Sequence, residues 1–175
     1  MSTLFVNKLK AAAGSIINVP AGQTLYAPGH VIQVAGNSLN TAVSITGTSF
    51  ADTGLTATLT PKQSTSKFLI MVDLGLVSTG TSDGVRFKLL RNSTEIGQAS
   101  GADTHNLFMQ VWPNSTVAYL GASNHFYDTP STASEITYKL QWAMTGSTNT
   151  GYINRRNSDN YARTTSNFTV MEIAQ

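Results

Sequence analysis

The chain has 175 residues, a formal net charge of +2 and no cysteine, and only 11% of its residues are charged. These values suit one domain with or without a short arm. They exclude a disulfide framework and a thiolate metal site, and they give no electrostatic indication of nucleic-acid binding. Charged residues make up about 25% of an ordinary soluble domain, so the polar surface here must consist largely of hydroxyls and amides. Such a surface favours packing against identical copies, because few charges have to be desolvated.

The first residues differ from the rest of the chain. No apolar run reaches the roughly 18 residues that cross a bilayer, and the opening lacks the regions of a signal peptide, so we expect no membrane association. Residues 1–28 are apolar only in patches and contain Pro20 and Pro28, so they cannot form a core alone. We predict an N-terminal arm over residues 1–28 and a folded body over residues 29–175. The alternative is that this segment supplies the first strand of the body.

The body alternates short apolar runs with clusters of Gly, Ser, Thr and Asn, which is typical of a β-sandwich or barrel. Its first half contains the strongest run, residues 67–77, followed by residues 85–90, in which alternate positions are apolar. The turn-forming residues between these two runs predict a hairpin. Weaker strands are expected at residues 30–34, 43–48 and 55–59.

The second half adds further strands. Residues 107–112 and 116–122 are expected to form a second hairpin, and residues 125–128 are expected in a polar loop. In the strand over residues 135–144, alternate side chains should face the core, and residues 167–173 form a last strand whose side chains alternate between two faces. The body then has roughly eight strands, which is the number in a jelly roll. Ile136, Tyr138, Leu140 and Trp142 share the face that is expected in the core. In the last strand one face carries Phe168, Val170 and Glu172, and the other carries Thr169, Met171 and Ile173.

Catalytic motifs are scarce. The sequence has no Gly-x-Ser-x-Gly elbow and no Gly-rich phosphate loop. Glu135 and Glu172 could form the carboxylate pair of a glycosidase, but a hydrogen-bonded structural carboxylate is the simpler interpretation. Two imidazoles and two carboxylates could together bind a metal, but we favour the interpretation that they lie in two unrelated polar loops. We expect no enzymatic activity and no cofactor. The residues of that metal hypothesis are Asp103, His105, His125 and Asp128.

Arginine and aromatic residues offer candidates for binding. Arg155 and Arg156 lie near two tyrosines, a combination found both in subunit interfaces and in contacts with glycans or nucleic acid. We favour an interface over nucleic acid. Trp112 follows a strand and is the better surface candidate of the two tryptophans. The residues predicted for a subunit interface or a ligand loop are Trp112, His125, Tyr127, Arg155 and Arg156.

Several segments resemble one group of proteins. The opening MSTLFVNKLK is similar to their N-terminal segment, and the other similar segments are LTATLTPKQSTSKFLIMVDLGLV, VRFKLLRNSTEIG, HFYDTPSTASEITYKLQWAM, YINRRN and RTTSNFTVMEIAQ. Together they resemble small virion proteins of marine and freshwater tailed phages, including cyanophages, over nearly the whole chain. The resemblance implies a C1q/TNF-like jelly roll that associates around a three-fold axis and has no catalytic residues. It implies a role either in head decoration or in a tail fibre.

Two non-enzymatic functions follow from these observations. As a capsid decoration (cement) protein, a homotrimer would stabilise the phage head, with the major capsid protein or other virion proteins as partners. As a tail fibre or receptor-binding tip, it would bind a host surface glycan through the loop residues named above. The short arm favours decoration, because a tail-fibre subunit usually carries a shaft. The residues expected to anchor the arm to the capsid are Leu4, Phe5, Val6 and Leu9.

Overall fold

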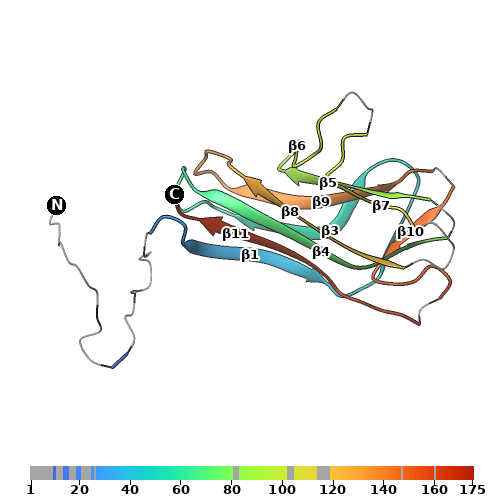
Figure 1. Ribbon diagram of the computed structural model, residues 1–175, viewed down its shortest axis with the longest axis horizontal. Coiled ribbons are helices and arrows are strands. Elements are labelled where there is room, and N and C mark those ends of the chain that lie inside the picture. The colour runs from blue at the N-terminus through green and yellow to red at the C-terminus, as the bar shows by residue number, and fades with distance from the viewer. Residues whose placement is uncertain are drawn as a thin grey trace.

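The protein is an antiparallel β-sandwich in its computed structural model (Figure 1). The described residues form 11 strands in two sheets, which confirms the predicted all-β class. The arm expected over residues 1–28 lies almost wholly outside the described residues, and so do its four predicted anchoring side chains. The structure describes residues 10, 14–15, 19–20, 25, 27–80, 83–101, 105–113, 119–146, 148–159 and 161–175.

The strands divide between two layers. The first sheet contains β1 Val31–Leu39, β2 Val43–Thr46, β4 Lys67–Thr79, β8 Leu120–Asp128, β10 Thr150–Ile153 and β11 Ser166–Ile173. The second contains β3 Ala51–Leu59, β5 Val85–Arg91, β6 Thr94–Ile96, β7 Met109–Val111 and β9 Ile136–Met144. The strands predicted before residue 113 and after residue 134 are present, most of them longer than expected. Strands β6 and β10 were not predicted.

Strands far apart in the sequence pair in a nested order. β1 pairs with β11, β3 with β9, β4 with β8 and β5 with β7, and every pair is antiparallel. The pairs alternate between the first and second sheets. The chain therefore runs as one long doubled ribbon that is wrapped into two layers.

Both predicted hairpins are wrong. β4 and β5 lie in different sheets, so the connection between them crosses from one layer to the other. β7 pairs with β5 and β8 pairs with β4, so the second expected hairpin is also split between layers. Strand β8 continues to Asp128, where a polar loop was expected. The alternation of apolar residues indicates which positions are buried, but it carries no information on the strand's partner.

The core fills the space between the two layers. Phe68, Phe87, Tyr138 and Phe168 are buried there, and the rings of Phe68 and Tyr138 lie 5.9 Å apart. The four positions predicted to face inward on β9 are buried, and on β11 the buried face is the one that carries Phe168, Val170 and Glu172. Burial of such side chains contributes about 25 cal/mol per Å² of apolar area and is the main force that holds the layers together.

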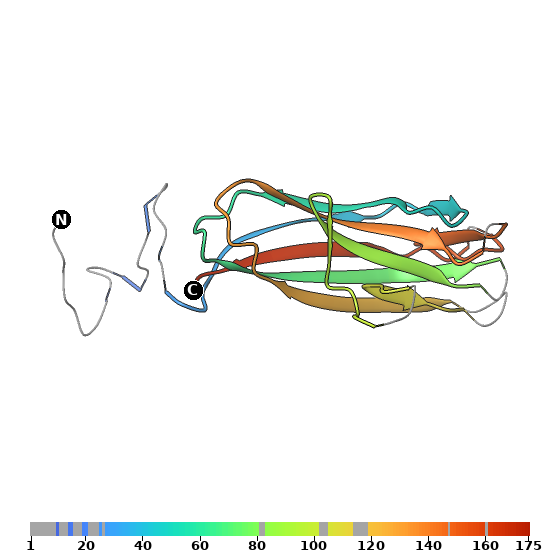
Figure 2. The same ribbon diagram turned by 90° about the horizontal axis from the view of Figure 1, so that it is seen from above.

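The two ends of the sandwich differ (Figures 1 and 2). The chain enters the body at residues 27–30, where Gly29 and His30 bond to the backbone of Ala174 near the C-terminus. Residues 40–42, together with residues 154–159 and 161–165 of the loop before β11, lie at the opposite end. We call these the entry end and the far end. They are separated by about 40 Å, because the 13 residues of β4 make twelve steps along the strand and each step advances roughly 3.3 Å.

Candidate functional site

The candidate site is the outer surface of the first sheet, across β1, β11, β4 and β8. Residues that pair across antiparallel strands point to the same face. Val34 pairs with Met171, Met171 with Leu69, and Leu69 with Tyr127. The adjacent row contains Gly36, Thr169, Met71 and His125 in the same strand order. We call this set of residues the outer band: Val34, Gly36, Leu69, Met71, His125, Tyr127, Thr169 and Met171.

The outer band is apolar for a surface open to water. Val34 is 58% exposed and Tyr127 is 47% exposed, and the methionines and Leu69 are partly exposed. The solvent-facing side of an antiparallel sheet normally carries polar residues. Contiguous exposed apolar surface is typical of a binding face.

The outer surface of the second sheet provides the contrast. There Lys88 pairs with Glu95 at 2.5 Å, and Asp52 contacts both Lys139 at 3.1 Å and the Gln141 amide at 2.7 Å. This sheet has the ion pairs and amides of a solvated surface, although few charges are available in the chain. The two outer faces therefore differ in composition, with ion pairs and amides on the second sheet and mainly apolar side chains in the outer band on the first.

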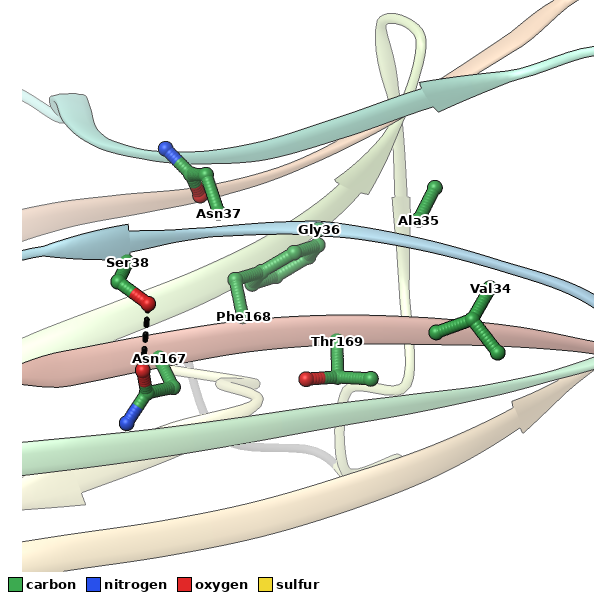
Figure 3. A pocket seen from close by; sticks show the side chains of 8 residues that line it. All are labelled: Val34, Ala35, Gly36, Asn37, Ser38, Asn167, Phe168 and Thr169. Atoms are coloured by element: carbon green, nitrogen blue, oxygen red, sulfur yellow. Dashed lines mark hydrogen bonds between the residues drawn. The ribbon is translucent and has the colours of Figure 1, made fainter.

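A shallow hollow at one edge of the outer band is built by Gly36 (Figure 3). A Cβ at this position would lie 2.0 Å from the carbonyl oxygen of Phe168, so a side chain cannot be placed there without moving the strands. Beside the hollow, the Ser38 hydroxyl donates to the Asn167 side chain at 2.7 Å. Figure 3 shows Val34 and Thr169 further along the same two strands. The hollow therefore combines an apolar side with a polar one.

The five residues predicted for an interface or ligand loop lie in three separate places. His125 and Tyr127 belong to the outer band, on β8 rather than on a loop. Trp112 is 52% exposed and lies beside Arg86 and His105 next to the second sheet. Arg155 and Arg156 lie in the far-end loop, where Arg155 stacks over Tyr152 at 4.4 Å.

The hypothetical metal site is not assembled. His125 is on the outer face of β8, whereas Asp128 is buried between the layers. The Asp128 carboxylate accepts from Arg91 at 2.8 and 2.9 Å and from the Tyr138 hydroxyl at 2.8 Å. Asp103 lies outside the described residues. Within the described part of the chain, no group of three or more His, Cys, Asp and Glu side chains could hold a metal ion.

Glu172 is a structural carboxylate. It is fully buried and accepts hydrogen bonds from the Gln33 side chain and from the backbone amides of Lys62, at 2.7 Å, and Gln63, at 3.3 Å. Glu135 is exposed before β9 and is not among these partners. The prediction that Glu172 is a hydrogen-bonded structural carboxylate is confirmed.

The apolar members of the outer band were missed by sequence reasoning. Leu69 and Met71 lie within the nearly continuous apolar run of β4, which predicts a strand but does not show that one of its two apolar faces is exposed. A strand that is covered by protein on both faces has such a nearly continuous apolar sequence. The useful signal was that β4 is apolar at both odd and even positions although its sandwich covers only one face.

Comparison with known protein families and with curated proteins yields no match. None of the described residues belongs to a helix with the length and hydropathy needed to cross a bilayer. The assignment of the outer band rests on its register, its exposure and its contrast with the second sheet.

Proposed function

We propose that the chain is a non-enzymatic structural protein of a tailed-phage virion, and that it works as a homotrimer of jelly rolls. The nested pairing of β1 with β11, β3 with β9, β4 with β8 and β5 with β7 supports the jelly roll, because that fold is a doubled antiparallel ribbon wrapped into two sheets. The resemblance of the sequence to small phage virion proteins supports the assignment to a phage particle. The exposed outer band is the observation that carries the proposal of self-association.

The composition of the outer band fits a second and third copy of the same chain. Around a three-fold axis that runs along the strands, identical residues approach one another at the same height, so a charged residue would meet its own like charge. Lys67 and Asp73 of β4 face outward beyond the two rows of the band, at opposite ends of it. Between them the band contains no Lys, Arg, Asp or Glu. Apolar and aromatic side chains in this position can pack without an electrostatic cost.

Capsid decoration is the role that we favour. The chain enters the sandwich beside its C-terminus, so an arm over residues 1–28 would attach to a capsid surface below the entry end. The sandwich would then stand with its far end outward. Proteins that bind only the assembled lattice stabilise it by mass action, and many copies on one shell act multivalently.

The oligomeric state tests the interface. Met71→Lys places a charge in the centre of the outer band, where three copies would bring like charges together. We expect sedimentation equilibrium to give a trimer for the wild-type chain and a monomer for the variant, with unchanged far-ultraviolet circular dichroism. The matched control is Thr58→Lys on the exposed side of β3, which should remain trimeric. A wild-type monomer, or a trimeric Met71→Lys variant, would contradict the interface.

The copy number tests the role. Quantitative mass spectrometry of purified particles should find hundreds of copies, as expected for a protein at local three-fold positions of a shell. A handful of copies would rule out decoration and leave the tail. Deletion of residues 1–28 should release the protein from particles while the trimer remains intact.

A tail fibre or receptor-binding tip is the second candidate. The observation that favours it is the far-end loop, where Tyr161 is 86% exposed and Arg156 lies 4.9 Å from its ring centre. Loops on a rigid scaffold commonly carry binding functions. Tyr161→Ala should then reduce adsorption to the host with no change in particle stability. Unchanged adsorption would remove this candidate.

A further inference from the structure

A polar pocket at the far end is held in a fixed shape by one buried side chain. Asn154 is fully buried and has a left-handed backbone, with φ of 65°. Its amide nitrogen donates to the carbonyl oxygens of Leu39 at 2.6 Å and Thr41 at 3.1 Å. Its side-chain oxygen accepts from the hydroxyls of Ser166 at 2.7 Å and Thr164 at 3.3 Å. The loop after β1 is thereby attached to both ends of the loop between β10 and β11.

Two arginines line this pocket together with residues 40–42. Arg155 and Arg163 form an isolated antiparallel bridge, which places the two residues side by side across the neck of the loop. Like charges at directly opposed positions are destabilising. None of the described residues that line the pocket is acidic, so the lining supplies no carboxylate to offset this repulsion.

Arg156, in the same loop, has a carboxylate partner. Its guanidinium is paired with Asp159, and this hydrogen bond and charge raise the pKa of Arg156 above its ordinary value. The guanidinium of Arg155 instead stacks on Tyr152 and donates to the carbonyl oxygens of Arg156 at 3.0 Å and Asn157 at 3.4 Å. These contacts orient Arg155 and leave its charge without a carboxylate partner in the pocket lining.

We propose that this pocket binds an oxyanion, a carboxylate or a phosphate, carried by a saccharide. A guanidinium presents paired donors that match a planar carboxylate or a phosphate. Asn40 and Thr41 add an amide and a hydroxyl to the pocket, and these groups suit the hydroxyls of a sugar ring. Tyr161, on the same loop, is exposed as a stacking surface. The inference needs neither the trimer nor the virion, because all of these groups belong to one chain.

The position of the pocket fits a ligand presented from outside. The loops that carry its lining residues lie at the far end, opposite the point where the chain enters the sandwich (Figure 1). An attachment through residues that precede β1 therefore leaves it accessible. A polymer such as a nucleic acid would be expected to need a longer basic track, whereas this pocket has two arginines at one point.

Titration calorimetry on the purified full chain tests the proposal. The probes are trigalacturonic acid, mannose 6-phosphate, neutral maltotriose and a dT hexamer. We expect one or both charged sugars to bind and maltotriose not to bind, with affinity that falls as salt rises. The tighter of the two charged sugars identifies the oxyanion as a carboxylate or a phosphate.

Two matched variants distinguish binding in the pocket from a general attraction to the positive charge of the protein. Arg163→Gln should weaken binding of the charged sugar about tenfold or more, in line with loss of one charge-assisted contact. Lys62→Gln removes the same charge from the exposed surface at the entry end and should change affinity less than about twofold. Equal effects of the two variants, binding of maltotriose, or no binding by either charged sugar would overturn the proposal. Tighter binding of the dT hexamer would overturn the saccharide assignment.

Discussion

The Arg91–Asp128–Tyr138 cluster gives a direct test of how the two layers are held together. Asp128 lies on β8 of the first sheet, whereas Arg91 and Tyr138 lie on β5 and β9 of the second. The carboxylate therefore crosslinks the sheets through an ion pair and a hydrogen bond. Burial raises the pKa of Tyr138 far above its ordinary value, and the hydrogen bond and charge of Asp128 raise it further. The phenol is thus the donor. Asp128→Asn removes the charge and keeps the shape.

The expected cost follows from the exposure of the partners. The side chain of Asp128 is 8% exposed and that of Arg91 is 27% exposed. Breaking a fully buried ion pair costs about 3–5 kcal/mol, because the remaining charge has no partner. Water reaches part of the Arg91 guanidinium and lowers this cost, so we expect about 2–3 kcal/mol at pH 7. Tyr138→Phe removes one hydrogen bond to a charged group and should cost about 1.5 kcal/mol.

Urea unfolding at fixed protein concentration measures these differences, because the stability of an oligomer depends on concentration. Asp52→Asn is the control, since Asp52 belongs to an exposed ion pair and its loss should cost less than about 1 kcal/mol. The buried Trp142 reports unfolding by fluorescence. If Asp128→Asn destabilises no more than Asp52→Asn, the cluster does not join the layers as argued.

Three further variants test single features. Burial raises the pKa of Asp83, but hydrogen bonds from Thr145, Asn149 and two backbone amides outweigh it and hold the pKa below its ordinary value. Asp83→Asn should therefore cost about 1–2 kcal/mol at pH 7, and urea titrations should show this difference shrinking below about pH 4, as the wild-type carboxylate is protonated. Gly36→Ala should cost about 2–3 kcal/mol in thermal unfolding through the clash with Phe168, whereas Gly80→Ala, whose Cβ meets no atom within 4 Å, should not. Asn154→Ala should lower the free energy of unfolding in urea by about 3 kcal/mol or more, because it loses four hydrogen bonds and a residue suited to positive φ. Asn154→Gly should recover the share of this loss that comes from the positive φ.

The sequence was sufficient to predict strand positions where burial alternates. In β5 and β9 every second residue is apolar because one side of the strand faces the other layer, so both strands and their inward residues could be predicted. β8 was placed too early because its inward positions include the small Ala122 and the polar Asn124 and Asp128. The Asn124 and Asp128 side chains form hydrogen bonds inside the sandwich, and no apolar pattern marks these positions. A buried polar strand resembles a loop in sequence.

Strand pairing could not be predicted, and the candidate site depends on it. The residues of the outer band come from four strands that are distant in the sequence, and only the register brings Val34, Met171, Leu69 and Tyr127 into one row. His125 and Tyr127 were selected for their residue types alone. The apolar side chains around these two residues can be recognised as one surface only when the nested pairing of the strands is known.

The few charges of the chain are distributed unevenly over the sandwich. Buried carboxylates at Asp128 and Glu172 bond to groups on neighbouring strands or loops, while the described ion pairs of β3, β5, β6 and β9 mark the outer side of the second sheet. The outer band has no such charge. If this surface were simply tolerant of any residue, charge should be as common there as on the second sheet. In the proposed trimer each charge placed on the band would be repeated around the axis, so an exposed band with charges only beyond its two ends, at Lys67 and Asp73, fits that proposal.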